Sequence, residues 1–238
     1  MSSPIWTADA LRSEAAPWRG KAWRLVEAQN IIATRKLVDS ISEQEELDRI
    51  IDESKPPVPP ECRHLHWLLF TPFRYGLYRS GSRFRRAGRT PGVFYAAENV
   101  ETAVAEMVHY RLLFFRESPG LDPSDNAATY SAFAVAVKTP FSLDLTLPSF
   151  EAQRETWTHP DNYDPCQTLA ETARASQVEV ILSQSVRDPS QGKNVNILTC
   201  AAFEKAAPVA RQTWRIRCDK HGATAYCEAP RTALEFRV

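Results

Sequence analysis

Hydrophobic residues follow a helical spacing in the first quarter of the chain. Five positions between residues 23 and 37 recur at intervals of three or four, which places them on one face of a helix: Trp23, Val26, Asn30, Ala33 and Leu37. A second helix is predicted from residue 42, where Ser-Glu-Gln-Glu resembles a capping box and precedes apolar residues on one face, Leu47, Ile50 and Ile51. We therefore expect residues 1–60 to form a helical N-terminal extension.

A proline-rich segment ends this helical pattern. Residues 55–60 read Lys-Pro-Pro-Val-Pro-Pro. Closely spaced prolines cannot continue a helix and favour an extended spacer. We place a domain boundary there, so that residues 61–238 form the second unit.

Beyond this boundary, short apolar runs alternate with helical patterns. Strands are predicted at 66–70, 93–97, 130–137, 141–145, 178–183 and 195–199, with 130–137 and 141–145 as two separate strands. Helices are predicted over 99–115, where Asn99 would be the N-cap, and over 165–175. Residues 214–218 and 223–227 predict a closing hairpin. Together these elements indicate an α+β fold.

Composition and charge exclude several classes of protein. The 238 residues include 29 Lys and Arg against 29 Asp and Glu, a balance that disfavours a general nucleic-acid or membrane surface. No apolar stretch approaches the roughly 18 residues of a membrane span, and the N-terminus shows no signal-peptide pattern. The five scattered cysteines form no Cys-x-x-Cys pair, which predicts reduced, mostly buried thiols in a cytoplasmic protein.

A local concentration of arginine is the most informative feature of the chain. Residues 62–97 contain seven arginines and no Asp or Glu. Arginine binds phosphate through a planar fork of donors and stays charged at every working pH, so two or three of them could hold a pyrophosphate. We favour Arg74 and Arg83, which lie beside aromatic residues, and expect 85, 86 and 89 to be surface charges; any of them could simply be solvated.

A tyrosine and a glutamate follow this basic stretch. Tyr95 lies in an apolar strand, where its ring either fills the core or stacks on a flat ligand such as nicotinamide. Glu106 lies within a helix and has no Lys or Arg one turn away. Such a carboxylate is either half-exposed or retained for function. A single carboxylate suits the loss of nicotinamide from NAD, because the leaving group is neutral and only the ribose cation needs stabilisation.

Ser185 and a few histidines complete the set of candidates. Ser185 follows a predicted strand and is either a positioning hydroxyl or an ordinary turn serine. His64 and His66 could share one strand face, but no third ligand lies at a suitable spacing, so we expect no metal. The chain has no P-loop and no Gly-x-Gly-x-x-Gly motif, which leaves phosphate binding to arginine side chains.

Taken together, these residues resemble the RES domain, a family named for its Arg, Glu and Ser and found as the toxin of bacterial toxin–antitoxin pairs. The resemblance spans about residues 66–205, and its matching segments are 82–97, 103–106, 166–170, 185–188, 192–194 and 201–203. It assigns the three named roles to Arg83, Glu106 and Ser185. It also matches Tyr95 to the family's tyrosine and Arg74 to an early arginine of the family.

The resemblance implies an ADP-ribosyltransferase-like split β-sheet core with flanking helices and NAD as the substrate. It implies cleavage of the nicotinamide–ribose bond and transfer of ADP-ribose to water, phosphate or a target protein. It also implies a helix-rich Xre-type antitoxin that covers the active site, in a homodimer or a toxin–antitoxin hetero-oligomer. The loop between Arg83 and Tyr95 is slightly longer than in shorter members, and residues 1–60 are absent from many compact members, so the acceptor stays open.

Two other functions are compatible with the sequence. The arginine-rich loop 74–89, with its interleaved aromatic residues, could belong to a module that binds single-stranded nucleic acid. The chain could also be a non-catalytic protein that binds a partner through its N-terminal helices.

Overall fold

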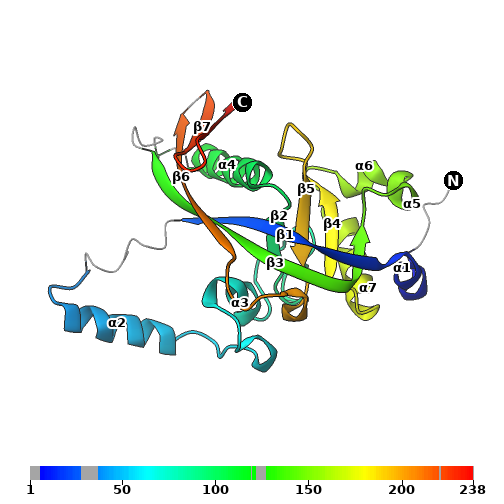
Figure 1. Ribbon diagram of the computed structural model, residues 1–238, viewed down its shortest axis with the longest axis horizontal. Coiled ribbons are helices and arrows are strands. Elements are labelled where there is room, and N and C mark those ends of the chain that lie inside the picture. Colours follow the sequence, from blue (N-terminus) through cyan, green and yellow to red (C-terminus); the bar gives the residue numbers. More distant parts are fainter. Residues whose placement is uncertain (1–5, 28–36, 119, 122–126, 220, 238) are drawn as a thin grey trace.

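The computed structural model describes residues 6–27, 37–118, 120–121, 127–219 and 221–237, which form an α+β fold (Figure 1). The helices are α1 (Ala8–Glu14), α2 (Ile41–Glu53), α3 (Trp67–Arg74), α4 (Val100–Glu117), α5 (Pro148–Glu151), α6 (Arg154–Trp157) and α7 (Asp164–Ala175). The strands are β1 (Ala16–Glu27), β2 (Phe94–Ala97), β3 (Ala128–Asp144), β4 (Val180–Gln184), β5 (Lys193–Ile197), β6 (Ala210–Asp219), β7 (Gly222–Cys227) and β8 (Thr232–Arg237). No described helix combines the length and the apolar character that a membrane crossing requires.

One long strand organises the sheet. The strand order is β1-β2-β5-β4-β3-β6-β7-β8, and β1 also pairs with β3. Strand β3 has 17 residues: its first half pairs antiparallel with β6, and its end pairs parallel with β4. Because β1 pairs with both β2 and β3, the strands β1, β2, β5, β4 and β3 form a closed ring of pairings, and β6, β7 and β8 extend from it.

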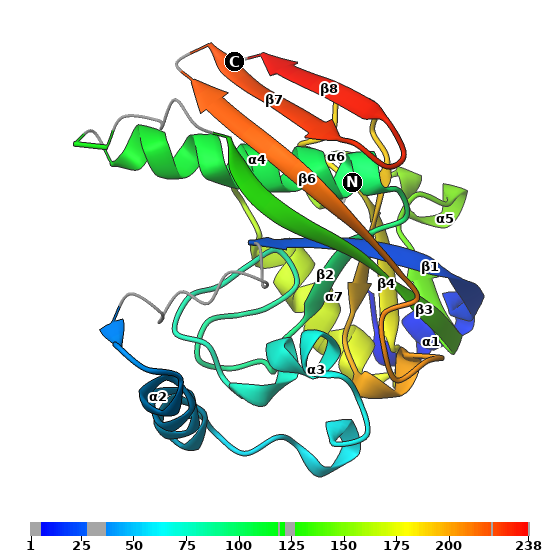
Figure 2. The same ribbon diagram turned by 60° about the vertical axis from the view of Figure 1, so that its left-hand side comes forward.

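Three apolar clusters fix the helices against this sheet. Helix α4 packs across β1, β6 and β7 through a cluster that includes Val104, Tyr130 and Trp214. Helix α3 covers the opposite side, as Figure 2 shows. Its Leu69 belongs to a second cluster there. Helices α1 and α7 enclose a third cluster around Leu11. Each cluster removes large apolar side chains from water, which is the main source of stability in a fold of this kind.

The helical prediction for residues 16–27 is wrong. These residues form β1, which pairs with β3 from Ala16 to Glu27. Both faces of β1 are covered: Ala22 contacts the cluster under α3, and Leu25 contacts the cluster under α4. Apolar residues therefore occur at odd and even positions, and the two-residue period of a strand is hidden. Positions 28–36 of the predicted helix lie outside the described residues.

Two further predictions of secondary structure are corrected. The run 66–70 is not a strand but the start of α3, because His66 caps the helix by accepting a hydrogen bond from Leu68 N. The segments 130–137 and 141–145 are not separate strands, since β3 continues from 128 to 144. Pro140 is tolerated within β3 because it lies at a β-bulge, where the register between β3 and β1 shifts between Ala16 and Trp18. A proline, which has no N–H to donate, is accepted in a strand at such a position.

Most of the remaining elements are confirmed. The second predicted helix is α2, although its capping box joins Ser40 to Glu43. The predicted helices 99–115 and 165–175 correspond to α4 and α7, and Asn99 takes the N-cap position without a side-chain hydrogen bond. The closing hairpin is formed by β6 and β7. The domain boundary near residue 60 stays a prediction. Strand β1, which precedes this boundary in the sequence, belongs to the same sheet as the strands that follow it.

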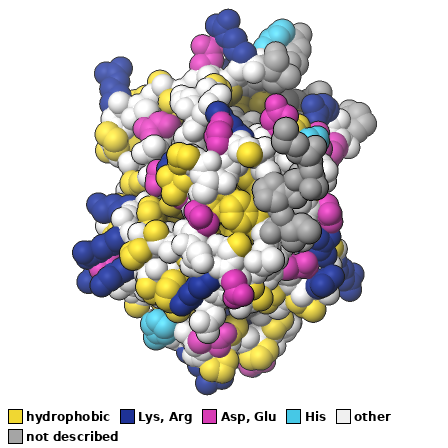
Figure 3. Space-filling model, turned by 90° about the vertical axis from the view of Figure 1, so that its right-hand side faces the viewer, with side chains coloured by type: hydrophobic (Ala, Val, Ile, Leu, Met, Phe, Trp, Pro, Cys, Tyr) yellow, Lys and Arg dark blue, Asp and Glu magenta, His cyan; other side chains and the backbone are white. Residues whose placement is uncertain are grey.

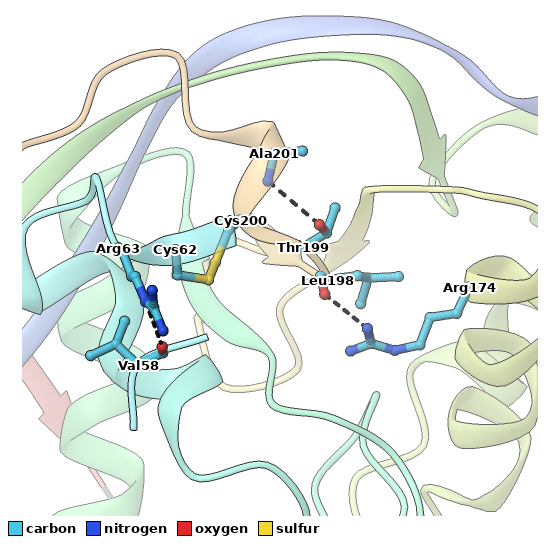
Figure 4. The surroundings of a disulfide bond; sticks show 8 residues. All are labelled: Val58, Cys62, Arg63, Arg174, Leu198, Thr199, Cys200 and Ala201. Carbon is cyan, nitrogen blue, oxygen red and sulfur yellow. Dashed lines mark hydrogen bonds between the residues drawn. A yellow bond between two sulfur atoms is a disulfide. The ribbon is translucent and has the colours of Figure 1, made fainter. Parts of the chain in front are cut away.

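The prediction that all five cysteines are reduced is also wrong. A disulfide joins Cys62 to Cys200, beside the loop in which Leu198 accepts a hydrogen bond from Arg174 (Figure 4). Both cysteines are buried in the cluster under α3. The other three, Cys166, Cys218 and Cys227, are buried free thiols, as expected. Spacing along the chain gave no signal for this pairing, because the two cysteines lie 138 positions apart.

We predict that the Cys62–Cys200 disulfide stabilises the folded chain. It closes a long loop, and cross-linking such a loop restricts the unfolded state, so Cys62→Ala/Cys200→Ala should lower the free energy of unfolding by about 2–4 kcal/mol. Urea unfolding without reductant measures the difference, and reductant should bring the wild type close to the variant. Five titratable thiols in the denatured, unreduced wild type would contradict the prediction.

Candidate functional site

The candidate site begins with Glu106 on helix α4. Buried residues of α4, among them Val104 and Val108, face the sheet, and Glu106 lies half-buried at the margin of that face. The helix therefore presents one carboxylate to the ends of β4 and β5 rather than to bulk solvent. No ion pair between Glu106 and a described Lys or Arg is present; its hydrogen-bond partners are Ser185 and Asn194.

Two neutral donors hold one oxygen of this carboxylate. Ser185, at the end of β4 and only 1% exposed, donates its hydroxyl to Glu106 Oε1 at 2.7 Å. Asn194, on β5, donates its Nδ2 to the same oxygen at 2.7 Å. The Ser185 hydroxyl also accepts hydrogen bonds from the backbone N–H groups of Arg187 and Asp188, which directs its proton to Glu106. Within the described residues, the second oxygen, Oε2, accepts no hydrogen bond.

The loop that carries Ser185 is fixed to α4. Thr102 donates its hydroxyl to Asp188 Oδ2 at 2.7 Å, and the Gly192 N–H donates to the same oxygen. A Cβ at Gly192 would collide with Thr102 Oγ1, so only glycine lets the loop approach the helix this closely. The positions of Ser185 and Glu106 are therefore set by the same helix–loop contact.

Tyr95 holds the arginine loop rather than lying free. Val93 and Tyr95 face one cluster, and Phe94 and Ala96 face the other, as strand alternation predicts. The Tyr95 hydroxyl is 2.7 Å from Ser82 Oγ and accepts a hydrogen bond from Phe84 N at 3.1 Å. Burial raises the pKa of this phenol. Tyr95 therefore fixes the two residues that flank Arg83.

The segment between α6 and α7 orients the side chain of Arg83. Its Nη1 donates to the carbonyl oxygens of Trp157 and His159, at 3.0 and 2.9 Å, and its guanidinium lies 4.7 Å from the ring centre of Tyr163. The same segment contacts the Ser185 loop, because Arg187 donates to the Pro160 carbonyl. Arg83 makes no ion pair with any described carboxylate, so its charge is not neutralised within the protein.

Tyr110, one turn after Glu106, connects these groups electrostatically. The surrounding protein raises the pKa of Tyr110 to about 12, chiefly by desolvation, and the neighbouring Tyr163, Glu106 and Tyr95 add to the rise. Direct contacts join Ser185 to Glu106. Arg83 is connected to the Ser185 loop through residues 157–160, which accept hydrogen bonds from both Arg83 and Arg187.

Arg74 does not belong to this group. Its guanidinium donates to Asp52 Oδ1 at 3.0 Å and to the Pro56 carbonyl oxygen at 2.5 Å, and its side chain is 13% exposed. Arg86 and Arg89 are also paired, with Glu171 and, for Arg86, Asp164. Three arginines of the basic stretch are thus neutralised by carboxylates from other parts of the chain.

An arginine that the sequence analysis missed takes a more suggestive position. Arg24 on β1 lies 4.8 Å from the ring centre of Phe94 and donates to the Tyr95 carbonyl oxygen, without an acidic partner among the described residues. Desolvation lowers its pKa to about 10. Arg85 lies 4.0 Å from the ring centre of Tyr78, and Arg24 and Arg85 both act on the phenol of Tyr78. Arg24 could have been recognised as a candidate if residues 16–27 had been predicted as a strand that pairs with β2.

The larger of the two cavities that we describe lies elsewhere. Its volume is about 680 Å³, and it is bounded by the start of α3 and by strands β3, β6 and β7, with none of Arg83, Tyr95, Glu106 and Ser185 in its wall. We base the candidate site on the contacts around Glu106 instead, because they join charged groups and donors. No cluster of three or more metal-ligating side chains occurs in the described part of the chain.

Comparison with solved structures finds a related fold. The crystal structure of the M. tuberculosis MbcT–MbcA toxin–antitoxin complex contains a chain that aligns with 88% of this chain and 91% of its own length, at 13% identity and a TM-score of 0.51. At this identity the likeness concerns the fold alone. Comparison with the curated proteins gives no match.

The sequence comparison with protein families is more decisive. The RES domain matches residues 58–219, about two thirds of the chain, and the match includes Arg83, Tyr95, Glu106 and Ser185. Strand β1 lies before it, and β7 and β8 follow it. This chain belongs to the RES domain family.

Proposed function

We propose that this protein is the toxin of a bacterial toxin–antitoxin pair and that it cleaves the nicotinamide–ribose bond of NAD. The observation that carries the proposal is the state of Glu106. One carboxylate oxygen is held by Ser185 and Asn194, and the other has no partner within the described residues. A carboxylate fixed by neutral donors keeps its negative charge for a ligand. Arg83, which has no carboxylate partner among the described residues, is connected to the Ser185 loop through residues 157–160.

The chemistry needs one negative charge and no acid catalyst. When the C1′–N bond of NAD breaks, its electron pair leaves with nicotinamide, which becomes a neutral base, and positive charge develops on the ribose. Glu106 Oε2 would accept a hydrogen bond from a ribose hydroxyl and face that charge, which is stabilisation where the charge appears. Water, phosphate or a protein nucleophile then bonds to C1′ and completes transfer of ADP-ribose.

The arginines would bind the diphosphate of the substrate. Arg83 is the first candidate, and Arg24 with Arg85 replaces Arg74, whose guanidinium is occupied by Asp52. A phosphate group would supply the negative charge that such an arginine lacks within the fold. Hydrogen bonds between charged groups are stronger than those between neutral groups. The Tyr95 hydroxyl would act by holding the Arg83 loop, and its ring would contact the nicotinamide half.

A partner protein would control this site in the cell. Tyr110 and Phe114 lie one and two turns beyond Glu106 on α4 and expose 54% and 46% of their surface. Exposed aromatic residues beside a catalytic group fit an interface that a partner covers. The fold neighbour was solved as a toxin–antitoxin complex. We propose an Xre-type antitoxin here, an ADP-ribosyltransferase-like core and a cytoplasmic site of action.

The alternative of nucleic-acid binding through residues 74–89 has less support. Arg74, Arg86 and Arg89 are engaged by carboxylates, so much of the loop's charge is compensated. On the face drawn in Figure 3, the described hydrophobic side chains in the middle are interspersed with Asp and Glu, and most of the Lys and Arg side chains lie toward the margin.

Incubation with NAD labelled in the adenylate half tests the proposed activity. We expect free ADP-ribose with water as acceptor, a phosphorylated ADP-ribose when phosphate is added, or a labelled protein band in cell extract. Each product identifies a different acceptor. Intact NAD after prolonged incubation of the folded, antitoxin-free protein in all three conditions would exclude the activity.

Glu106→Gln should abolish most turnover while leaving substrate binding largely intact. Glutamine keeps the size and one hydrogen-bonding oxygen but removes the charge, and loss of one preorganised electrostatic group costs about 100-fold or more in kcat. Glu101→Gln, at an exposed position of the same helix, is the matched control and should retain wild-type kcat. Equal rates of NAD loss for Glu106→Gln and Glu101→Gln would remove Glu106 from the mechanism.

Arg24→Gln should raise the KM for NAD roughly tenfold or more, with a smaller effect on kcat. A charged hydrogen bond to phosphate is worth about 1.5–3 kcal/mol, and the contact exists in both the bound substrate and the transition state. Arg74→Gln is the control and should leave KM near the wild-type value. The assignment fails if Arg74→Gln raises KM and Arg24→Gln, with an unchanged circular dichroism spectrum, does not.

A further inference from the structure

Transfer of ADP-ribose to water requires a group that accepts a proton. A water oxygen that bonds to C1′ must lose one proton, because the product carries a neutral hydroxyl group there. Glu106 faces the ribose, and Ser185 and Asn194 already hold its Oε1. A phenol with a raised pKa and a guanidinium are both protonated at neutral pH, so Tyr95 and Arg83 are not bases. The proton acceptor must therefore be another side chain near Glu106.

His109 lies on the same face of α4 as Glu106, one turn further along the helix. Thr102, Glu106 and His109 follow one another at intervals of four and three residues, so their side chains form one row. The first two members of this row contact the loop after β4, through Asp188 and Ser185. Because Cα–Cβ bonds of a helix tilt toward its N-terminus, the His109 side chain leans toward the turn that carries Glu106, with about 5–6 Å between the two Cβ atoms.

The imidazole of His109 is free to accept a proton. It is half-buried, and within the described residues its ring nitrogens make no hydrogen bond. The other four histidines of the chain differ from it. Nδ1 of His66 and Nδ1 of His159 accept hydrogen bonds from backbone N–H groups, and His64 and His221 are exposed. Only His109 combines a position one turn from the candidate carboxylate with ring nitrogens that no described residue occupies.

The surroundings of His109 keep its imidazole neutral near pH 7. Groups from three segments contact it or act on its charge: Glu106, Tyr110 and Arg116 from α4, Arg187 from the loop after β4, and Asp161 from the segment between α6 and α7. Burial lowers the pKa of the imidazole from its usual 6.5; Arg187 and Arg116 add to this effect, whereas Glu106 and Asp161 oppose it. A neutral imidazole can accept a proton, and a protonated one cannot.

We propose that His109 is the general base that takes a proton from water as the water oxygen bonds to C1′, which makes water an acceptor that this site activates. The inference rests on the cleavage of NAD proposed above. The C1′–N bond breaks with its electron pair on nicotinamide, the water oxygen forms the new bond to C1′, and one proton of the water passes to a ring nitrogen of His109. The half-buried imidazole then releases this proton to solvent, and Glu106 keeps its separate role beside the ribose.

This role separates water from phosphate as an acceptor. Phosphate at neutral pH carries oxygens that have already lost their protons, so its attack on C1′ needs no base. Removal of the His109 imidazole therefore slows transfer to water and spares transfer to phosphate. A histidine that only supports the fold would affect both reactions equally.

His109→Gln tests the role in the full chain, with ADP-ribose and phosphorylated ADP-ribose separated after incubation with labelled NAD and phosphate. Hydrolysis should fall roughly 100-fold, at the lower end of the usual contribution of general base catalysis, and transfer to phosphate should stay near the wild-type rate. His64→Gln, at an exposed position before α3, is the matched control and should retain both rates.

Two further measurements distinguish a base from a structural residue. In the wild type, kcat/KM for hydrolysis should fall as the pH drops through a pKa below 6.5, because the protonated imidazole cannot accept a proton, and His109→Gln should lose this dependence. Added imidazole should restore hydrolysis by His109→Ala, in which the truncated side chain leaves space for it, but not by Glu106→Gln.

Several outcomes would overturn the proposal. Unchanged hydrolysis by His109→Gln would do so, as would equal losses of hydrolysis and phosphate transfer without rescue by imidazole. A wild-type profile with no titration below pH 6.5 would overturn it whether or not the variants fold. A wild type that transfers ADP-ribose to phosphate but never to water would also overturn it, while the proposed cleavage of NAD would stand. NAD that stays intact in every condition would instead remove the proposed function, and this inference with it.

Discussion

The hydrogen bonds that Ser185 and Asn194 donate to Glu106 Oε1 join three separate elements of the fold. The acceptor comes from α4, and the donors come from the residue that follows β4 and from β5. Donors without charge orient the carboxylate but do not neutralise it, whereas a lysine or arginine at the same distance would compensate its charge. The remaining oxygen can therefore act on a ligand, and its direction is set by the sheet rather than by the flexibility of a glutamate side chain.

The supporting contacts explain why this geometry is rigid. Thr102 and Gly192 bring the β4–β5 loop against α4 through Asp188. Tyr95 fixes the residues on either side of Arg83 through its hydroxyl. Apart from Asp188, the groups that make these positioning contacts are uncharged. The arginines near Tyr95 are held differently, because they hydrogen-bond to carbonyl oxygens or stack on aromatic rings. Such arginines remain available to a phosphate.

The sequence supplied the chemistry of the site more readily than its architecture. Glu106 stood out as a candidate because it lies in an apolar helix without a cationic neighbour, and Tyr95 because it lies in an apolar strand directly after the basic loop. Arg74 was misplaced because its partner, Asp52, lies 22 positions away in a helix whose packing the pattern does not reveal. Arg24 was missed because both faces of β1 are buried, which removes the alternation that marks a strand.

Long-range pairing set the limit of sequence-based reasoning. The Cys62–Cys200 disulfide and the ring of strands both join residues more than a hundred positions apart, and nothing local encodes them. Helix α4 and the β6–β7 hairpin were predictable because their stabilising contacts follow a regular period or a short turn. Regular elements follow from local pattern, but the grouping of their ends into a site depends on the tertiary fold.

A crystal structure of the protein with a non-cleavable NAD analogue tests the central claim most directly. The account predicts that the nicotinamide-side ribose lies within hydrogen-bonding distance of Glu106 Oε2 and that the diphosphate contacts Arg83 or Arg24. An analogue bound in the cavity beside α3, or a diphosphate held by Arg74 with Glu106 turned away from the ribose, would contradict it.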